Sequence, residues 1–358
     1  MQVSIVGAGG VAYSYAAVLA ERGHQPRIWS PSGRRGAELA AGAPLQASTA
    51  LEGSFAVEVA RSVEDLAEAG TVIFALPAYG YHEVMGRVVP VLRDGQTLIL
   101  SGHLSFAAVY LSKLLAARGL ACPIVVWNTT ASTGRQTGPT SVSISMLRPK
   151  VEMAALPDRA GEAALLLCRS LFGDRFALSG DMLGVDLGNL NPIVHYGIAL
   201  FNLTRMELAE DWAQQAHITP AVARFLEDLD RERLAVAEAL GVRTRSIHQA
   251  YAVPGKIEIG PLAEMLRQIT ATRKGVNGPR SLDTRYVTED VPYGLLTTVR
   301  LADLAQVEVP LHRAGITVFS ALYGRDFAAE NRILPEIDAA FASAATLRRA
   351  VTQGWEAL

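Results

Sequence analysis

The sequence predicts an α/β fold in two parts: a doubly wound parallel sheet domain over residues 1–180, followed by an all-α domain over residues 181–358. The length favours two domains, because a typical domain has roughly 150 residues. In the first half, short apolar strand patterns alternate with helical patterns, which is typical of a parallel sheet covered by helices. Beyond residue 180 the β-branched runs give way to helical periodicity.

The composition excludes several classes of protein. Half of the residues are hydrophobic, and 33 basic residues nearly balance 35 acidic ones, so we expect a globular chain without a nucleic-acid partner. No signal segment precedes the first strand and no apolar run could span a bilayer, so we expect a soluble, cytoplasmic protein with no membrane partner. Cys122 and Cys168 show neither metal nor disulfide spacing and fit buried thiols in a reducing compartment.

The N-terminus reads strand, glycine turn, helix, strand. The strand Gln2–Val6 leads into GAGGVA, a helix follows over residues 11–22, and a second strand covers Gln25–Trp29. This context makes the GxGxxA pattern a dinucleotide-binding turn of the Rossmann type, with free N–H groups at the helix start for the phosphates. The alternative is a plain glycine turn. The predicted cofactor contacts are Gly7 for the tight turn, Gly9 for close approach of the pyrophosphate, Gly10, and Ala12 for close helix–strand packing.

The end of the second strand indicates which nicotinamide cofactor binds. A free ribose 2′-hydroxyl is usually held by a carboxylate at this point, yet none occurs before Glu38. Two hydroxyl groups and two guanidinium groups are present instead, and arginine pairs with phosphate in a forked geometry. We therefore expect NADP(H) in preference to NAD(H). If the two arginines form only a solvated face of the next helix, the cofactor preference stays undecided. These four residues are Ser30, Ser32, Arg34 and Arg35.

Further strands and helices complete the first domain. Three apolar segments are predicted to be buried parallel strands: Gly70–Leu76, Thr97–Ser101 and Pro123–Asn128. Helical patterns occur at about residues 81–92, 107–118 and 158–171. Alternation at Ser141–Ser145, and more loosely at Val151–Ala154, indicates one or two extra strands at the edge of the sheet, where an antiparallel arrangement is allowed. A short segment, Phe176–Leu178, ends the domain near residue 180.

Residues that follow the parallel strands are candidates to line the cofactor cleft, because ligands of such sheets lie beyond the carboxyl ends of the strands. Pro77 ends one of these strands and is predicted to contact the cofactor. His82 and His103 lie near the same rim. We interpret both as helix-start or polar rim residues and not as catalytic groups.

The second half is predicted to be helical throughout. Thr219-Pro220 marks one helix start, since threonine caps a helix and proline suits its first position. The apolar faces of these helices would also allow a homodimer. The predicted helices cover about residues 192–209, 219–240, 260–272, 294–306, 310–323 and 334–353.

One histidine has a setting suited to catalysis. The stretch GNLNPIVHYGIALFNLTR, starting at Gly188, places His195 in the first turn of a helix, and RYVTEDVP, starting at Arg285, contains Asp290. We predict that His195 and Asp290 meet in space and transfer protons beside a nicotinamide. In that arrangement the carboxylate would fix the tautomer of the histidine. The alternatives are a histidine satisfied within the core and a surface ion pair around Asp290. Arg285 would clamp a carboxylate at two points.

These residues resemble the octopine/nopaline-type opine dehydrogenases. The likeness runs through nearly the whole chain and rests on the Gly7-Ala8-Gly9 turn, the NPIVH motif that ends at His195, and the RYVTEDV motif that starts at Arg285. The order and spacing of the last two motifs make them more specific than the glycine turn. The Ile28–Pro31 segment is similar to the second-strand end of NADPH-using members.

The resemblance implies a reductive condensation. The α-amino group of an amino acid and the carbonyl of a 2-oxo acid such as pyruvate would give an imine, which takes hydride from NAD(P)H. The resemblance further implies that His195 is the catalytic acid/base, that Asp290 is its partner, and that Arg285 binds a substrate carboxylate.

The neighbours of His195 are expected to shape the substrate pocket, and we assign Asn191 and Tyr196 to substrate binding. Tyr196 stands where the family commonly has proline, and Gly10 stands in the glycine turn where asparagine is frequent. Neither departure removes a chemical group, but Tyr196 bears on the pocket shape and hence on the identity of the substrates.

Two rival functions fit parts of the sequence. A ketopantoate reductase or hydroxyacid dehydrogenase would use a catalytic lysine, and none of the four lysines lies in such a motif: Lys113, Lys150, Lys256 and Lys274. A non-catalytic NADP(H) sensor would keep the glycine turn but would not need the histidine, arginine and aspartate together. No metal is expected, because the remaining helical histidines lack ligand spacing: His217, His248 and His312.

Overall fold

The chain folds into two compact units. The computed structural model describes residues 1–33, 35–255, 257–272 and 277–358. The sheet unit comprises Met1–Asp186 together with Glu336–Leu358, and the helical unit comprises Leu187–Pro335. This division differs from the expected one at residue 180, because the last residues of the chain return to the sheet unit. There the backbone N–H of Trp355 donates to Ser112 Oγ at 2.9 Å.

The main sheet has the doubly wound topology that the sequence predicted. Its strand order is β12-β11-β8-β7-β6-β1-β2-β5, and all neighbours pair in parallel except β11, which is antiparallel to β8. The carboxyl ends of the parallel strands therefore share one edge, where Rossmann-type folds bind dinucleotides. The strands are β1 (Gln2–Val6), β2 (Gln25–Trp29), β5 (Glu58–Val59), β6 (Thr71–Phe74), β7 (Thr97–Leu100), β8 (Ile124–Trp127), β11 (Val151–Leu156) and β12 (Phe176–Leu178).

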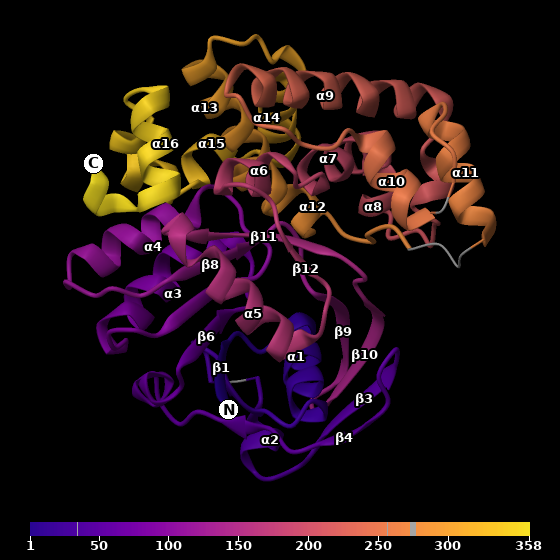
Figure 1. The fold of residues 1–358 in the computed structure, drawn as a ribbon. Helices are drawn as coiled ribbons and strands as arrows, with labels where there is room; N and C mark the ends of the chain where they lie inside the picture. The colour runs from indigo at the N-terminus through magenta and orange to yellow at the C-terminus, as the bar shows by residue number, and fades with distance from the viewer. Residues whose placement is uncertain (34, 256, 273–276) are drawn as a thin grey trace. The chain divides into compact units, whose positions relative to one another are not determined.

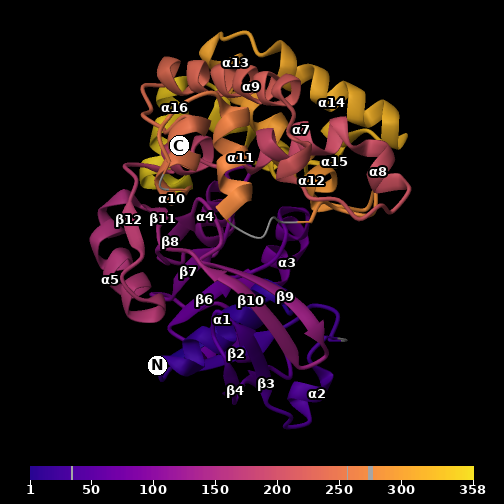
Figure 2. The same ribbon diagram turned by 90° about the vertical axis from the view of Figure 1, so that its right-hand side faces the viewer.

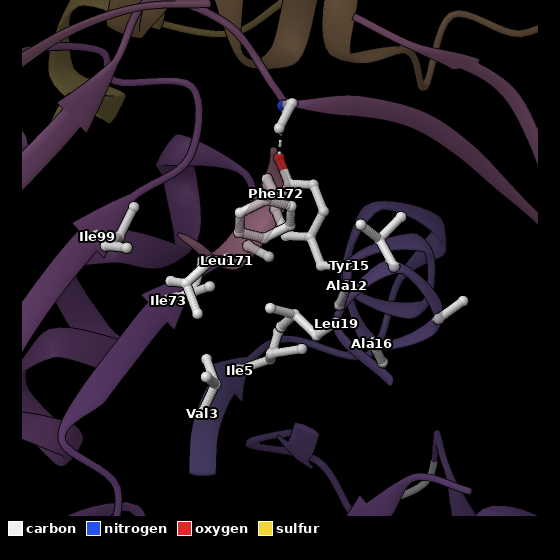
Figure 3. Close-up of a cluster of buried hydrophobic side chains, with 14 of the residues drawn as sticks. Val3, Ile5, Ala12, Tyr15, Ala16, Leu19, Ile73, Ile99, Leu171 and Phe172 are labelled. Carbon is white, nitrogen blue, oxygen red and sulfur yellow. Dashed lines mark hydrogen bonds between the residues drawn. The ribbon is translucent and has the colours of Figure 1, made fainter. Parts of the chain in front are cut away.

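Helices connect and cover these strands (Figure 1). They are α1 (Gly10–Glu21), α2 (Ala37–Ala40), α3 (Tyr81–Val88), α4 (Ala107–Ala116), α5 (Gly161–Phe172), α6 (Met182–Leu187) and α16 (Ala344–Gln353). Apolar side chains of α1 meet those of the central strands in one buried cluster, which Figure 3 shows. Each fully buried leucine or isoleucine there contributes about 1.5–3 kcal/mol. The Tyr15 hydroxyl accepts a hydrogen bond from the N–H of Ala131 at 2.9 Å, drawn dashed in the same figure.

A second sheet, of four strands, packs on the other side of α1, so that α1 lies between the two sheets (Figure 1). The expectation that residues 141–145 extend the main sheet is therefore wrong, whereas β11 does join its edge. The crossing is close: a Cβ on Gly10 would lie 2.4 Å from the carbonyl oxygen of Gly134. The strands are β3 (Leu45–Thr49), β4 (Gly53–Phe55), β9 (Ser132–Gly138) and β10 (Ser141–Leu147), in the order β4-β3-β10-β9.

The helical unit is built around α9, which lies beside α13 in Figures 1 and 2. Thr219 caps α9 as predicted, its side chain accepting from the N–H of Val222. No described helix of the chain is long and apolar enough to cross a membrane. The helices are α7 (Asn191–Phe201), α8 (Leu203–Glu207), α9 (Pro220–Ala239), α10 (Ile247–Gly255), α11 (Leu262–Thr272), α12 (Arg285–Thr288), the π-helix η6 (Val291–Leu295), α13 (Leu296–Ala305), α14 (Pro310–Tyr323) and α15 (Phe327–Glu330).

Two predicted long helices are interrupted in the structure. The helix expected over 192–209 ends at Phe201, because Asn202 leaves helical geometry at φ −130° and its side chain donates back to the carbonyl of Ile198. The helix expected over 334–353 is split into η7 (Leu334–Phe341) and α16, with Ser343 capping the second piece. Sequence periodicity continued across both breaks, and the helices α6, α10 and α12 were not predicted.

Candidate active site and cofactor-binding turn

His195 and Asp290 meet within the helical unit, as the sequence predicted. His195 Nδ1 lies 2.7 Å from Asp290 Oδ2, and the two side chains are 18% and 6% exposed. Because an ionised carboxylate can only accept, Nδ1 carries the proton and donates a hydrogen bond to Asp290. Nε2 has no partner among the described residues, which leaves it available for proton transfer to a substrate.

Local packing brings the two segments together. His195 lies one turn into α7, whose second residue is Pro192, and Asp290 is the N-cap of η6. Pro192 sits directly on Gly294, where an added Cβ would lie only 2.4 Å from the proline Cγ. Glycine is therefore required at this position of η6, and the close contact sets the distance between the histidine and the carboxylate.

The segment after Asp290 is a π-helix, a form often found at functional sites. The wider turn of a π-helix changes which N–H groups the backbone carbonyls pair with. Neighbouring side chains donate hydrogen bonds to two of these carbonyls. Asn331 Nδ2 donates to the carbonyl of Pro292 at 2.7 Å, and Thr297 Oγ1 donates to that of Tyr293 at 2.7 Å. The backbone around Asp290 is thus held by buried hydrogen bonds.

Tyr286 lies flat against His195. The two ring centroids are 3.6 Å apart and the planes differ by 7°. The tyrosine hydroxyl donates to Gln214 Oε1 at 2.6 Å, which fixes the ring in place. Burial, and next the negative charge of Asp290, raise the pKa of Tyr286 to about 12, so the phenol stays neutral. The sequence pattern did not indicate a role for Tyr286, although it lies only four residues before Asp290.

The two further polar residues assigned to substrate binding are accessible. Arg285 is 59% exposed and lies 3.4 Å from the carboxylate of Glu289, which is itself largely buried. Asn191 is exposed at the first turn of α7, where its N–H donates to Asn189 Oδ1 at 3.0 Å. An exposed guanidinium five residues before Asp290 is suited to binding a carboxylate.

Tyr196 does not line this site, which corrects the assignment made from the sequence. Its ring is buried between Phe225 and Phe319, with centroids 5.3 and 5.6 Å away. Successive residues of a helix point about 100° apart, so the neighbour of His195 faces the core. Burial and the nearby Glu232 raise the pKa of Tyr196 to about 12.

A second histidine–carboxylate pair lies within the same unit. His312 is fully buried, and its Nδ1 lies 2.7 Å from Glu232 Oε2. Glu232 also accepts the backbone N–H groups of Leu311 and His312 at the start of α14. Burial opposes ionisation of Glu232, but these hydrogen bonds lower its pKa overall. The pair caps a helix and has the geometry of a structural element.

The glycine turn of the sheet unit fits a dinucleotide. Gly7 has φ +133° and a Cβ there would lie 2.4 Å from the carbonyl oxygen of Ala75, so only glycine fits this turn. Gly9, the N-cap of α1, faces open space, since a Cβ there would come no closer than 4.0 Å to Arg35 Nη1. Ala12 is fully buried against the sheet, as predicted. The free N–H groups of α1 therefore point to a cradle that can hold a pyrophosphate.

Polar groups surround the end of β2. Ser30 Oγ lies 3.4 Å from Ser32 Oγ, and Arg35 is exposed with its guanidinium near Gly9. Arg34 lies outside the described residues. Pro77 follows β6 at the same edge of the sheet and caps a short helical turn.

The remaining candidates of the sheet unit have structural contacts. His103 is fully buried and not a rim residue: its Nε2 accepts from the N–H of Ala108, and its Nδ1 lies 2.9 Å from Asp186. His82 stacks on Tyr110. Lys113 pairs with Glu336 at 3.0 Å and Lys150 with Glu152 at 3.5 Å, whereas Lys256 and Lys274 lie outside the described residues. Cys122 and Cys168 are free and buried, as expected.

The fold and these sites define an NAD(P)-dependent oxidoreductase. Residues 178–323 match the family model described as NAD/NADP octopine/nopaline dehydrogenase, alpha-helical domain. An opine dehydrogenase of Arthrobacter sp. (strain 1C) is 28% identical over 97% of this chain and 98% of its own length. The chain thus resembles the octopine/nopaline-type opine dehydrogenases, through the family model over its helical unit and through this relative over nearly its whole length.

Solved structures agree with this fold. An octopine dehydrogenase in complex with NADH and agmatine matches with a TM-score of 0.79 at 17% identity, covering 98% of both chains. A yersinopine dehydrogenase with bound NADP⁺ matches with a TM-score of 0.70 at 15% identity, covering 95% of this chain and 99% of that one. At such identities the likeness is one of fold, and the two proteins bind different nicotinamide cofactors.

Proposed function

We propose that this protein is an opine dehydrogenase that uses NADPH to join the α-amino group of an amino acid to a 2-oxo acid, giving an N-(carboxyalkyl)amino acid. The observation that carries the proposal is the His195–Asp290 pair, in which one imidazole nitrogen is held by a carboxylate and the other is available. The match of residues 178–323 to the family model supports the reaction class, and the octopine dehydrogenase structure named above is a complex with NADH and agmatine.

The condensation requires several proton transfers near neutral pH, which histidine can carry out with little tuning. His195 Nε2 takes a proton from the substrate ammonium group, so that the free amine can attack the carbonyl carbon of the 2-oxo acid. His195 then returns the proton to the hydroxyl of the tetrahedral adduct, which leaves as water and gives the protonated imine. Asp290 stabilises the imidazolium in between and keeps Nδ1 protonated.

Arg285 would hold a carboxylate of the substrates, and Asn191 offers an amide at the start of α7. Fixing the carboxylate orients the imine for reduction, which is a large part of what an enzyme can contribute. Gly7, Gly9, Gly10 and the N-terminus of α1 would hold the cofactor, which when bound supplies the hydride. The imine carbon takes up the hydride, and the product nitrogen becomes a secondary amine.

The preference for NADP(H) rests on the end of β2. Ser30, Ser32 and Arg35 follow the end of this strand, and Arg34 would add a second cation. No carboxylate lies between the end of β2 and Glu38. The 2′-hydroxyl of NAD(H) would lack its usual carboxylate partner there.

The test is oxidation of NADPH with a panel of amino acids crossed with pyruvate, 2-oxoglutarate and glyoxylate. NADH is run in parallel, and His195→Ala serves as the control. Turnover that requires both an amino acid and a 2-oxo acid, and is lost in the control, would establish the reaction. Turnover with a 2-oxo acid alone would make the protein a hydroxyacid dehydrogenase. NADPH binding without turnover on any pair would favour the sensor function.

A further inference from the structure

A third cation lies at the carboxyl end of β2, and it comes from helix α3. The guanidinium of Arg87 lies over the indole of Trp29, 5.1 Å from the ring centroid. Its Nη1 donates to the carbonyl of Pro31 at 3.3 Å. Trp29 is the last residue of β2 and is 5% exposed, so it provides a fixed apolar support. Both contacts tie Arg87 to the strand end where dinucleotide-binding folds distinguish a 2′-hydroxyl from a 2′-phosphate.

Within the described parts of the chain, no carboxylate lies within ion-pair distance of Arg87. Arg27, which lies on β2 with Trp29, is different, because it pairs with Glu58 at 2.9 Å and with Glu68 at 2.7 Å. A guanidinium held by an aromatic face and one carbonyl keeps most of its five N–H donors for another acceptor. Arg87 is thus an oriented cation whose charge no acidic side chain of the described residues neutralises.

We propose that Arg87 is a specificity-determining residue for the cofactor, binding the 2′-phosphate of NADP(H) together with Arg35 while Trp29 holds its guanidinium in place. The inference rests on the proposed use of NADP(H). The planar guanidinium matches phosphate oxygens in a two-point geometry that a lysine cannot reproduce. Arg35 Nη1 lies near Gly9 at the start of α1, 4.0 Å from where a Cβ on that glycine would be.

If Arg87 binds the 2′-phosphate, the residues that follow β2 are only part of what determines the proposed preference for NADP(H). Arg87 belongs to the helix after β6, which the fold brings next to Trp29 and Pro31. A guanidinium at this position can also stack on the adenine ring of the cofactor, because arginine stacks on aromatic faces. Adenine is common to NAD(H) and NADP(H), so the experiment must separate binding of the base from binding of the 2′-phosphate.

The test measures binding of 2′,5′-ADP and 5′-AMP by isothermal titration calorimetry, without any turnover. The variants are Arg87→Ala and Arg87→Gln, the second keeping a polar side chain of similar length. Arg93→Ala is the matched control, an exposed arginine that precedes β7 at the opposite end of the sheet. We expect the two Arg87 variants to weaken 2′,5′-ADP binding about 10-fold or more and to change 5′-AMP binding less than about 2-fold. Arg93→Ala should change neither.

The outcomes separate this inference from the proposed cofactor preference. Equal weakening of both nucleotides would assign Arg87 to the adenine and overturn the inference. Unchanged binding in both Arg87 variants, with the wild-type protein still favouring 2′,5′-ADP, would overturn it while the NADP(H) preference stands. Equal affinities in the wild-type protein would overturn the preference and the inference together. The ratio of the KM values for NADPH and NADH should move in the same direction as the binding data.

Discussion

His195 Nδ1 donates to Asp290 Oδ2 across 2.7 Å, and the imidazole that makes this bond is covered on one face by Tyr286. The histidine is therefore restrained in two independent directions, in its plane by the carboxylate and perpendicular to it by the phenol ring. Such restraint leaves one nitrogen with a defined orientation, which acid/base catalysis requires.

Replacing Asp290 by asparagine should abolish most of the activity while leaving cofactor binding intact. The amide oxygen of asparagine can still accept a hydrogen bond from Nδ1, but it has no negative charge to stabilise the imidazolium, so we expect kcat to fall roughly 10²–10⁴-fold. Steady-state kinetics and NADPH titration of Asp290→Asn check this. His195→Ala should lose a comparable factor, and the double variant should be little worse than either single one. Additive losses would show that the two side chains act separately.

Tyr286 can be tested with two substitutions that divide its contacts. Tyr286→Phe keeps the ring on His195 but loses the hydrogen bond to Gln214, so we expect kcat within a few-fold of wild type. Tyr286→Leu removes the stacked ring and should lower kcat about 10-fold, because the imidazole gains freedom. Since the pKa of Tyr286 is raised to about 12, its hydroxyl stays protonated through neutral and moderately alkaline pH. The pH–rate profiles of wild type and Tyr286→Phe should coincide there; divergence would mean that the phenol itself transfers a proton.

The parts of the molecule that repeat a simple pattern could be predicted from the sequence. Buried parallel strands are near-continuous apolar runs, so β1, β6, β7 and β8 were recognised, and Thr219-Pro220 marked the start of α9. The second sheet could not be predicted in this way. Its strand β9 reads STGRQTG and has small or polar residues, because it packs on α1 through the close Gly134–Gly10 contact instead of large apolar side chains.

For the candidate site, the meeting of its two central residues could be predicted from the sequence, whereas the surrounding geometry could not. The pairing of His195 with Asp290 followed from two motifs, whereas the burial of Tyr196 and the stacking of Tyr286 depend on which way each side chain points. Nearly every residue in the apolar run of α7 is suited to the core, so hydrophobic periodicity could not distinguish the side of the helix that faces the core from the side that faces the candidate site. The π-helix η6 could not be predicted either, because its packing depends on the contact between Gly294 and Pro192, which is distant in the sequence.

Arg285 should act on substrate binding more than on the chemical step. Arg285→Ala removes an exposed guanidinium whose described ion pair, with Glu289, is 3.4 Å long. If it binds a substrate carboxylate, KM for the 2-oxo acid should rise about 10–100-fold with a smaller change in kcat. Arg267→Ala is a matched control, since Arg267 is exposed and pairs with Glu264 on α11. A fall in kcat at unchanged KM would contradict a carboxylate-binding role.

Gly294 couples packing to the site and should tolerate no side chain. The Cβ introduced by Gly294→Ala would lie 2.4 Å from Pro192 Cγ, so α7 and η6 must separate. We expect a loss of about 1–3 kcal/mol in the free energy of unfolding, and a fall in kcat because His195 and Asp290 move apart. Thermal denaturation and kinetics check both effects. Gly86→Ala, also helical, would meet no atom within 4 Å and should be neutral or slightly stabilising.

Glu232 should make the stability of the protein sensitive to acid. Its pKa is lowered in the folded protein, chiefly because hydrogen bonds from His312 and the start of α14 outweigh the cost of burial. A depressed carboxyl pKa stabilises the fold above the unfolded value, ordinarily 4.5, and this contribution is lost as the pH falls through the folded pKa. Glu232→Gln should therefore lower the free energy of unfolding by about 1–3 kcal/mol at neutral pH.

The difference between Glu232→Gln and wild type should shrink as the pH falls from the ordinary carboxyl value through the lower folded pKa, because below the folded pKa both proteins have a neutral group at this position. Denaturant unfolding at neutral and acidic pH measures it. Glu238→Gln, an exposed site on the same helix α9, is the control and should change stability by less than about 0.5 kcal/mol. A constant difference across this pH range would mean that shape, and not charge, is what Glu232 contributes to the start of α14.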